Sequence, residues 1–350
     1  MQSLLNVYIG KLIENLPVLE FIYPSAQKGK INQFGENGLF DGQSEYVNIV
    51  NDPNDADYIL VPYSYGHIAG KKEYISQIEN IAKDCGKKII VFVLGDSNEF
   101  VEIKNCIVFR MSQYKYCKMS NEIIMPAYAH DLGSIYNRQI HQKEKIPLVG
   151  FCGWADNPFG YREVKYLSKY IFWSFLGNFD ARFKARAPGV LLRRRILKTI
   201  QKSELVNNDF IIRTTYSGSN KTISLNAGVA REQYVENITR SDYALAIKGD
   251  GNFSVRFYEI LSMGCIPVLI DTDLKLPLEG VVDYNSFVLK VPLNKLKQID
   301  KEIRSFHDSI SDEKYKSMQK SAREAFNEYL SINSFLRHVL RKDFLEGVNV

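Results

Sequence analysis

Several signals that would assign a protein to a class at once are missing from this chain of 350 residues. No apolar run approaches the roughly 18 residues that suggest a transmembrane helix, so we expect no membrane-spanning segment. The N-terminus has neither a basic first region nor a small-residue cleavage site, and it is interpreted as a first strand or short helix rather than a signal peptide. Together these absences favour a cytoplasmic protein.

Cysteine patterns are also missing. The chain has five cysteines, an odd number, and no two of them form a CxxC pair. This usage predicts neither a disulfide framework nor a zinc site, and it favours a reducing compartment.

Catalytic and cofactor motifs with a strong signature do not occur. The sequence contains no HExxH, no GxSxG, no GxGxxG and no GK[ST]. The acidic pattern Asp271–Asp273 resembles a metal-binding DxD, but Asp55–Asp57 has the same form, and so short a pattern arises by chance. We therefore expect no metal and no required cofactor.

Positively charged residues are only mildly in excess, and the net charge of the chain is +5. This balance fits an anionic small ligand, an anionic polymer or an anionic membrane surface, but it lacks the dense basic footprint of nucleic-acid binders. No nucleic acid is expected as a partner. The one basic cluster, 193–198, is interpreted as a solvated helix face.

The segment Tyr170–Lys184 is apolar in its first half and basic in its second. Two interpretations are open. It lies on a membrane surface as a peripheral contact, or it forms a buried helix end followed by a turn, which is the reading we favour.

What the sequence does contain is typical of a soluble α/β protein. Hydrophobic residues make up 45% of the chain and charged residues 24%. Runs rich in Ile and Val, without clean alternation, alternate with helical patterns, which predicts parallel sheets covered on both faces. The length fits two domains. We expect residues 1–145 to form the first, 146–310 the second, and 311–350 to form helices that cross back toward the first.

One stretch, Ile247–Ile270, breaks a local rule. Ser254 and Gly264 are suited to begin and end a helix. Arg256 then lies in the first turn, where a cation opposes the helix dipole at a cost of a few tenths to about 1 kcal/mol. An anion bound at the helix N-terminus would remove that cost. Glu259, on the same face, is suited to accept hydrogen bonds from a ribose, so the pattern indicates a nucleotide. A surface salt bridge between Arg256 and Glu259 is the alternative.

The stretch from Arg240 to Phe287 also resembles the signature region of the exostosin-family glycosyltransferases. The shared pattern is a Gly-Asp-Gly loop, Ser-x-Arg-Phe-x-Glu, Gly-x-Ile-Pro-Val, and a Leu-Pro pair. Weaker similarities occur in "NDPNDADYILVP", "IPLVGFCGW" and "FIIR". The resemblance implies a GT-B fold, in which two Rossmann-like domains face a cleft and the second binds the donor. It also implies inverting transfer of a sugar from a nucleotide sugar, usually a UDP-sugar, to a saccharide acceptor.

The expected site follows from the helix pattern and the resemblance together. Without a metal, arginines and a helix N-terminus would stabilise the leaving diphosphate. The expected donor-binding residues are Arg162, Arg213, Lys248, Gly249, Asp250, Gly251, Asn252, Phe253, Ser254, Arg256 and Glu259. A general base is expected from the first domain, with Asp96 and His67 as candidates and the pair His130–Asp131 as a weaker third.

The predicted function is therefore glycosyl transfer in the synthesis of a surface polysaccharide or glycan, on an acceptor that is free or lipid-linked. A non-catalytic nucleotide- or polysaccharide-binding module of the same fold is the alternative. A nicotinamide-dependent oxidoreductase is disfavoured because GxGxxG is missing.

Overall fold

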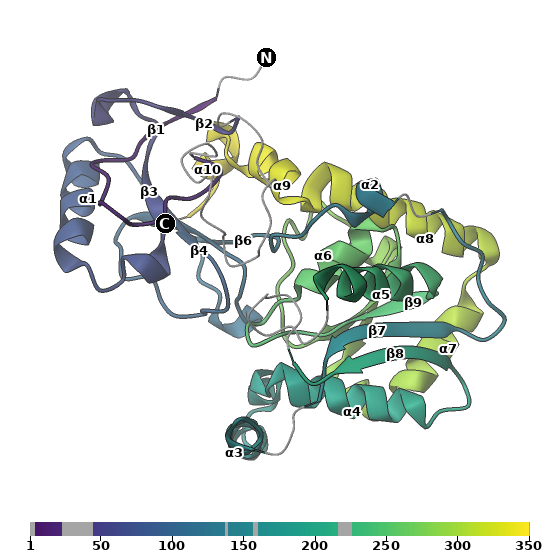
Figure 1. Cartoon of the computed structure of the whole chain (residues 1–350). Helices are drawn as coiled ribbons and strands as arrows, with labels where there is room; N and C mark the ends of the chain where they lie inside the picture. Colours follow the sequence, from purple (N-terminus) through teal and green to yellow (C-terminus); the bar gives the residue numbers. More distant parts are fainter. Residues whose placement is uncertain (1–3, 23–44, 137–138, 157–159, 216–225, 350) are drawn as a thin grey trace.

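The computed structural model describes residues 4–22, 45–136, 139–156, 160–215 and 226–349. Figure 1 shows two α/β domains side by side, with the helices at the end of the chain running along both. Each domain is built on one sheet whose strands pair in parallel. The predicted fold class is confirmed.

The first sheet has the strand order β2-β1-β3-β4-β5-β6. Every residue of its central strands β3, β4 and β5 is buried, as expected for strands covered on both faces. The elements of this domain are β1 (Leu5–Tyr8), β2 (Val47–Ile49), β3 (Tyr58–Ser64), α1 (Lys72–Asp84), β4 (Ile89–Val93), β5 (Cys106–Arg110), β6 (Glu122–Ile124) and α2 (Leu132–Tyr136).

The second sheet has the order β11-β10-β9-β7-β8. Its elements are β7 (Leu148–Trp154), α3 (Tyr161–Leu176), α4 (Gly189–Gln201), β8 (Asn207–Arg213), α5 (Ala227–Arg240), β9 (Tyr243–Ala246), α6 (Val255–Ser262), β10 (Ile266–Asp271), β11 (Leu289–Pro292) and α7 (Ile299–Ser309). The last strand of the first sheet ends at Ile124, and the first strand of the second sheet begins at Leu148. We propose that the domain boundary lies between them, near residue 145.

Helix α6 forms where its cap residues predicted it. Ser254 has the extended backbone of an N-cap, and Gly264 follows the last turn with a φ of 62°, a conformation that glycine adopts without strain. Phe257 and Leu261 are buried on the inner side of the helix. This packing fixes the first turn of α6, with Arg256, at the carboxyl edge of the second sheet.

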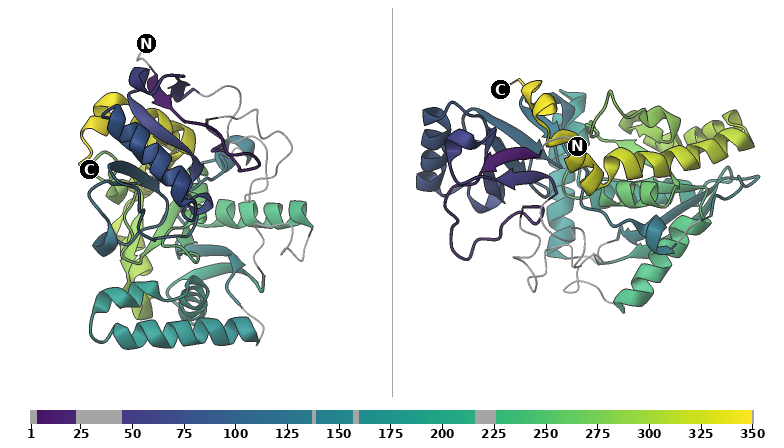
Figure 2. Two further views of the ribbon diagram at one scale, coloured as in Figure 1. Left: turned by 90° about the vertical axis from the view of Figure 1, so that its left-hand side faces the viewer. Right: turned by 90° about the horizontal axis from the view of Figure 1, so that it is seen from above.

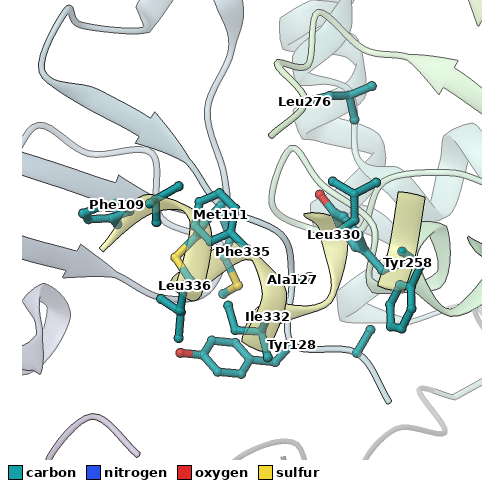
Figure 3. Close-up of a cluster of buried hydrophobic side chains, with 14 of the residues drawn as sticks. Phe109, Met111, Ala127, Tyr128, Tyr258, Leu276, Leu330, Ile332, Phe335 and Leu336 are labelled. Atoms are coloured by element: carbon teal, nitrogen blue, oxygen red, sulfur yellow. The ribbon is translucent and has the colours of Figure 1, made fainter. Parts of the chain in front are cut away.

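The C-terminal helices join the two domains. They are α8 (Asp312–Ala325), α9 (Ile332–Val339) and α10 (Lys342–Glu346). Arg323 of α8 pairs with Asp131 and donates a hydrogen bond to the carbonyl of Ser262. Phe335 of α9 packs edge-to-face on Phe109 of the first sheet, at 6.4 Å between ring centroids. Figure 3 shows α9 side chains between residues of both domains, in one continuous apolar cluster.

The structure contains short elements that the sequence did not predict, and it exposes a surface that was expected to be buried. Strands β2 and β11 were not predicted, because both are short and lie at sheet edges, where they are only partly buried. The reading of Tyr170–Lys184 as a buried helix end is wrong, since Ile171 and Phe175 on α3 are exposed by 65% and 60%. Among the described helices, none is long and apolar enough to cross a membrane.

Candidate active site

The candidate site lies where β9 ends and α6 begins. Residues 247–254 form the loop between them, at the carboxyl edge of the second sheet. In open α/β sheets, ligands bind outside the carboxyl ends of the strands. The loop and the first two turns of α6 carry nine of the eleven predicted donor-binding residues, so the fold itself places them together.

Arg256 reaches from α6 toward β7. Its guanidinium carbon lies 4.4 Å from the ring centroid of Phe151 and 4.9 Å from that of Tyr234, and it donates a hydrogen bond to the carbonyl of Cys152. A Cβ on residue 153 would lie 2.5 Å from a guanidinium nitrogen, so Gly153 makes room for the arginine. The half-buried side chain is thus held by two cation–π contacts.

Glu259 lies one turn further along α6. Its carboxylate accepts hydrogen bonds from the Tyr234 hydroxyl at 2.5 Å and from Arg231 at 3.4 Å. Among the described residues, no ion pair joins Glu259 to Arg256, so the surface salt bridge considered as an alternative is not formed. Tyr234 instead links the two, with its ring on Arg256 and its hydroxyl on Glu259. Burial and the neighbouring Glu259 carboxylate raise the pKa of Tyr234 well above its usual value, so the hydroxyl stays a donor.

Arg213 adds a second positive charge to this edge. It ends β8 opposite Trp154 in the β7–β8 register and donates to the carbonyl of Ala230 at 3.0 Å. Burial raises the pKa of the Cys152 thiol, while Arg256 and Arg213 both act to lower it. Both guanidinium groups therefore lie near the carboxyl end of β7, where they make the local potential more positive.

The glycine loop itself is docked on the first domain. The amide of Gly251 donates to the Asp96 carboxylate at 3.0 Å, and the amide of Asn252 donates to the Ser112 hydroxyl at 2.9 Å. The amide of Gly249 closes a turn onto the carbonyl of residue 253 at 3.2 Å. These three amides, expected from the sequence to face a phosphate, are already engaged in this arrangement of the two domains.

Asp96 thus faces the loop directly, in accordance with its predicted position across the domain junction. Burial raises the pKa of its carboxyl, and the hydrogen bond from the Gly251 amide opposes that rise. A Cβ on residue 251 would lie 2.6 Å from the Asp96 carboxylate, so only glycine allows this approach. The adjacent cavity, lined by Met111 and Lys248 among others, measures about 20 Å³, which is room for about one water molecule.

Lys248 is buried at the same junction, with 4% of its surface exposed. Its ammonium group donates to the Tyr114 hydroxyl at 3.1 Å and to the Ala185 carbonyl at 2.7 Å. Burial lowers its pKa to about 7, against the opposing effect of Asp250. A lysine that titrates near neutral pH responds to any charge brought next to it.

Arg186, which the sequence indicated only as a neighbour of the basic cluster 193–198, connects the domains beside Lys248. Arg186, at the end of the 3-10 helix Ala181–Arg186, lies over the rings of Tyr114 at 5.1 Å, Tyr116 at 5.6 Å and Trp173 at 5.1 Å. It also donates to the Tyr116 hydroxyl at 2.6 Å. Both tyrosines come from the first domain, so this cluster stabilises the closed junction.

The basic cluster 193–198 is not the uniformly solvated face that we expected. Arg193 turns inward and donates to the carbonyls of Trp154 at 3.0 Å and Lys248 at 2.9 Å. Arg194 pairs with Glu163 of α3. The high density of arginines in this segment is the signal that the sequence offers. The sequence does not show, however, which of the three consecutive arginines faces the sheet.

Three other predicted residues lie apart or cannot be placed. His67 is exposed in the 3-10 turn after β3. Asp131 of the weaker pair is held by Arg323 and Ser134 as part of the domain connection. Arg162 lies in the first turn of α3, and its side chain is not among the parts of the chain that the structure describes.

The acidic pattern Asp271–Asp273 is engaged in other contacts. Asp271 pairs with Lys290 at 3.3 Å and Lys115 at 3.7 Å, and the Asp273 carbonyl accepts from the Lys115 amide at 2.9 Å. In the part of the chain that the structure describes, no three His, Cys, Asp or Glu side chains are grouped to hold a metal ion.

The comparison of this chain with known protein families gives a match that includes the candidate site. Residues 166–306 match the family model described as "Exostosin GT47 domain". Over these residues the chain is similar to the exostosin GT47 family. The predicted resemblance is confirmed, and the matched residues include Arg213 and the whole Lys248–Glu259 segment.

Two curated relatives match this chain over a minor part of their own length. The chain is 33% identical over 112 residues to "Exostosin-1 homolog" of Caenorhabditis elegans, covering 32% of this chain and 28% of the relative. It is 32% identical over 82 residues to "Exostosin-1b" of Danio rerio, covering 23% of this chain and 11% of the relative. A solved glycosyltransferase from Rickettsia africae is 9% identical, covers 83% of this chain and 89% of its own, and superposes with a TM-score of 0.37.

Proposed function

We propose that this protein is an inverting glycosyltransferase. It would move a sugar from a nucleotide sugar, with a UDP-sugar as the expected donor, to a saccharide or glycan acceptor in surface polysaccharide or glycan synthesis. The observation that carries the proposal is the position of Arg256. Its charge lies in the first turn of α6, inside an exostosin GT47 domain and at the carboxyl edge of a parallel sheet.

Donor recognition is assigned to the edge formed by β7, β8 and α6. Arg256 and Arg213 would hold the diphosphate, because both are guanidinium groups placed near the carboxyl end of β7. Glu259 would accept a hydrogen bond from a ribose hydroxyl in exchange for one of its present donors, Arg231 or Tyr234. Lys248 would gain a proton as negative charge approaches it.

In the reaction, the acceptor hydroxyl oxygen attacks the anomeric carbon while the bond from that carbon to the diphosphate oxygen breaks. The hydroxyl proton passes to a base, for which Asp96 is the best placed group of the two candidates. Its raised pKa makes it a stronger base than an ordinary aspartate. The charge that develops on the departing diphosphate would be stabilised by the arginines without a metal.

Because Asp96 and the amides of Gly251 and Asn252 are bonded across the junction, donor entry would require that the domains separate locally. The non-catalytic alternative of the same fold predicts nucleotide binding without transfer. A thermal-shift screen of nucleotide sugars, followed by turnover of the best binder with saccharide acceptors, tests the proposal. Binding with turnover supports it, and binding without donor hydrolysis or transfer supports the alternative.

A further inference from the structure

Helix α3 presents an apolar stripe to solvent. The stripe consists of Val164, Leu167, Ile171, Phe172 and Phe175 on the helix, together with Phe179 just after it. Ile171, Phe175 and Phe179 are exposed by 65%, 60% and 78%. Soluble proteins rarely leave a contiguous apolar patch uncovered, and such patches mark sites of association.

The stripe is held outward by the opposite side of the same helix. Trp173 stacks on Phe183 at 5.9 Å between ring centroids, and the Tyr166 ring contacts that of Trp154 at 6.1 Å. Glu163 is buried and pairs with Arg194. These contacts fix the rotation of α3 about its axis. Figure 2 (left) shows the helix lengthwise along one outer edge of the second domain.

Positive charge borders the stripe. Lys165 and Lys169 are exposed and lie one turn apart along one edge of it. Glu163 is the only acidic residue of α3, and it is buried in an ion pair on the opposite side. An apolar, aromatic-rich face with lysines along its border is the pattern of a helix that lies in the plane of a bilayer interface.

We propose that the α3 stripe docks this protein on an anionic lipid bilayer surface. The aromatic and aliphatic side chains would enter the boundary between headgroups and acyl chains, while Lys165 and Lys169 extend to the anionic headgroups. A second copy of the chain fits this surface less well, because the exposed face of α3 offers no carboxylate to pair with those lysines. The net charge of +5 acts in the same direction as the lysines.

The test is flotation of the full chain with vesicles of phosphatidylcholine that contain or lack phosphatidylglycerol. The wild type should float with the anionic vesicles. The double variant Ile171→Ser, Phe175→Ser should lose about tenfold or more of its partitioning. Both side chains are exposed, so its melting temperature should stay at the wild-type value. Phe100→Ser removes an aromatic ring that is 66% exposed in the first domain, and it should bind like the wild type.

A second pair of variants tests whether the charges of Lys165 and Lys169 contribute to vesicle binding. Lys165→Glu, Lys169→Glu should abolish the preference for anionic vesicles. Lys316→Glu, Lys320→Glu makes the same change at the same spacing on the exposed side of α8 and should leave the preference intact. Equal flotation of the wild type and the stripe variants, or no flotation of the wild type, would overturn the proposal. So would a dimer in sedimentation velocity that the stripe variant dissolves, because the stripe would then be covered by a second copy.

Discussion

Helices α3 and α6 follow neighbouring strands of one sheet, yet their apolar faces meet different surroundings. Helix α6 follows β9 and buries Phe257 and Leu261 with 1% or less of their surface exposed, whereas α3 follows β7 and leaves Ile171 and Phe175 more than half exposed. The two helices have comparable amphipathic patterns in sequence. The difference teaches that periodicity identifies an apolar face but does not say what covers it.

Removing one phenylalanine from each helix tests whether the two apolar faces differ in burial in solution. Phe257→Ala should lower the free energy of unfolding by about 3–5 kcal/mol, because it leaves a cavity in the core that joins both domains. Phe175→Ala should change it by no more than about 0.5 kcal/mol, because that ring is already in water. Urea unfolding at one pH measures both. Equal losses in the two variants would mean that α3 is covered in solution.

The role of the first domain can be tested at Asp96. Asp96→Asn should lower turnover by about 10²–10⁴-fold, since the amide can still accept the hydrogen bond of Gly251 but cannot take up a proton. His67→Ala, at the exposed candidate, should have little effect. In the wild type, activity should fall with decreasing pH as the carboxyl protonates, with a midpoint above the usual aspartate value of about 3.9 because burial raises the pKa. Full turnover in both variants would show that neither residue is the base.

A smaller effect is expected at Glu259. Glu259→Ala should weaken binding of a nucleoside diphosphate by about tenfold in titration calorimetry, through loss of a hydrogen bond to the ribose. Arg231→Ala removes a partner of Glu259 and keeps its carboxylate, so it should bind more nearly like the wild type. If the two variants weaken binding equally, the ion pair rather than the carboxylate is what the site needs.

The most gradual effect is a pH slope in the free energy of unfolding at Lys248. Its pKa is about 7 in the folded chain and about 10.4 in the unfolded chain, so between these values only the unfolded chain holds the proton. Stability should therefore rise with pH in this window, by at most about 1.4 kcal/mol per pH unit, and the rise should be absent in Lys248→Met. Denaturant unfolding of both proteins across the window measures the difference. Parallel pH profiles would contradict a buried, titrating lysine.

Much of the candidate site was predictable because its signals are local. The caps of α6 and the position of Arg256 in its first turn follow from residues within one short stretch, and parallel strands place that stretch at a sheet edge. The contact of Asp96 with Gly251 was not predictable, because it joins segments far apart in the chain through the packing of two domains. The burial of Lys248 and the aromatic cluster around Arg186 were not predictable for the same reason. Whether the apolar face of α3 is covered or exposed was not predictable either.

The central claim is that the charge of Arg256 serves a bound diphosphate rather than the fold. Steady-state turnover of Arg256→Met with the best-binding nucleotide sugar tests it most directly, because methionine can still pack between the rings of Phe151 and Tyr234. Turnover should fall by about 10²–10³-fold, while the melting temperature falls only slightly, since removing a cation that opposes the helix dipole offsets part of the loss of two cation–π contacts and the hydrogen bond to Cys152. Turnover at the wild-type level, or lost turnover with a matching loss of stability, would contradict the claim.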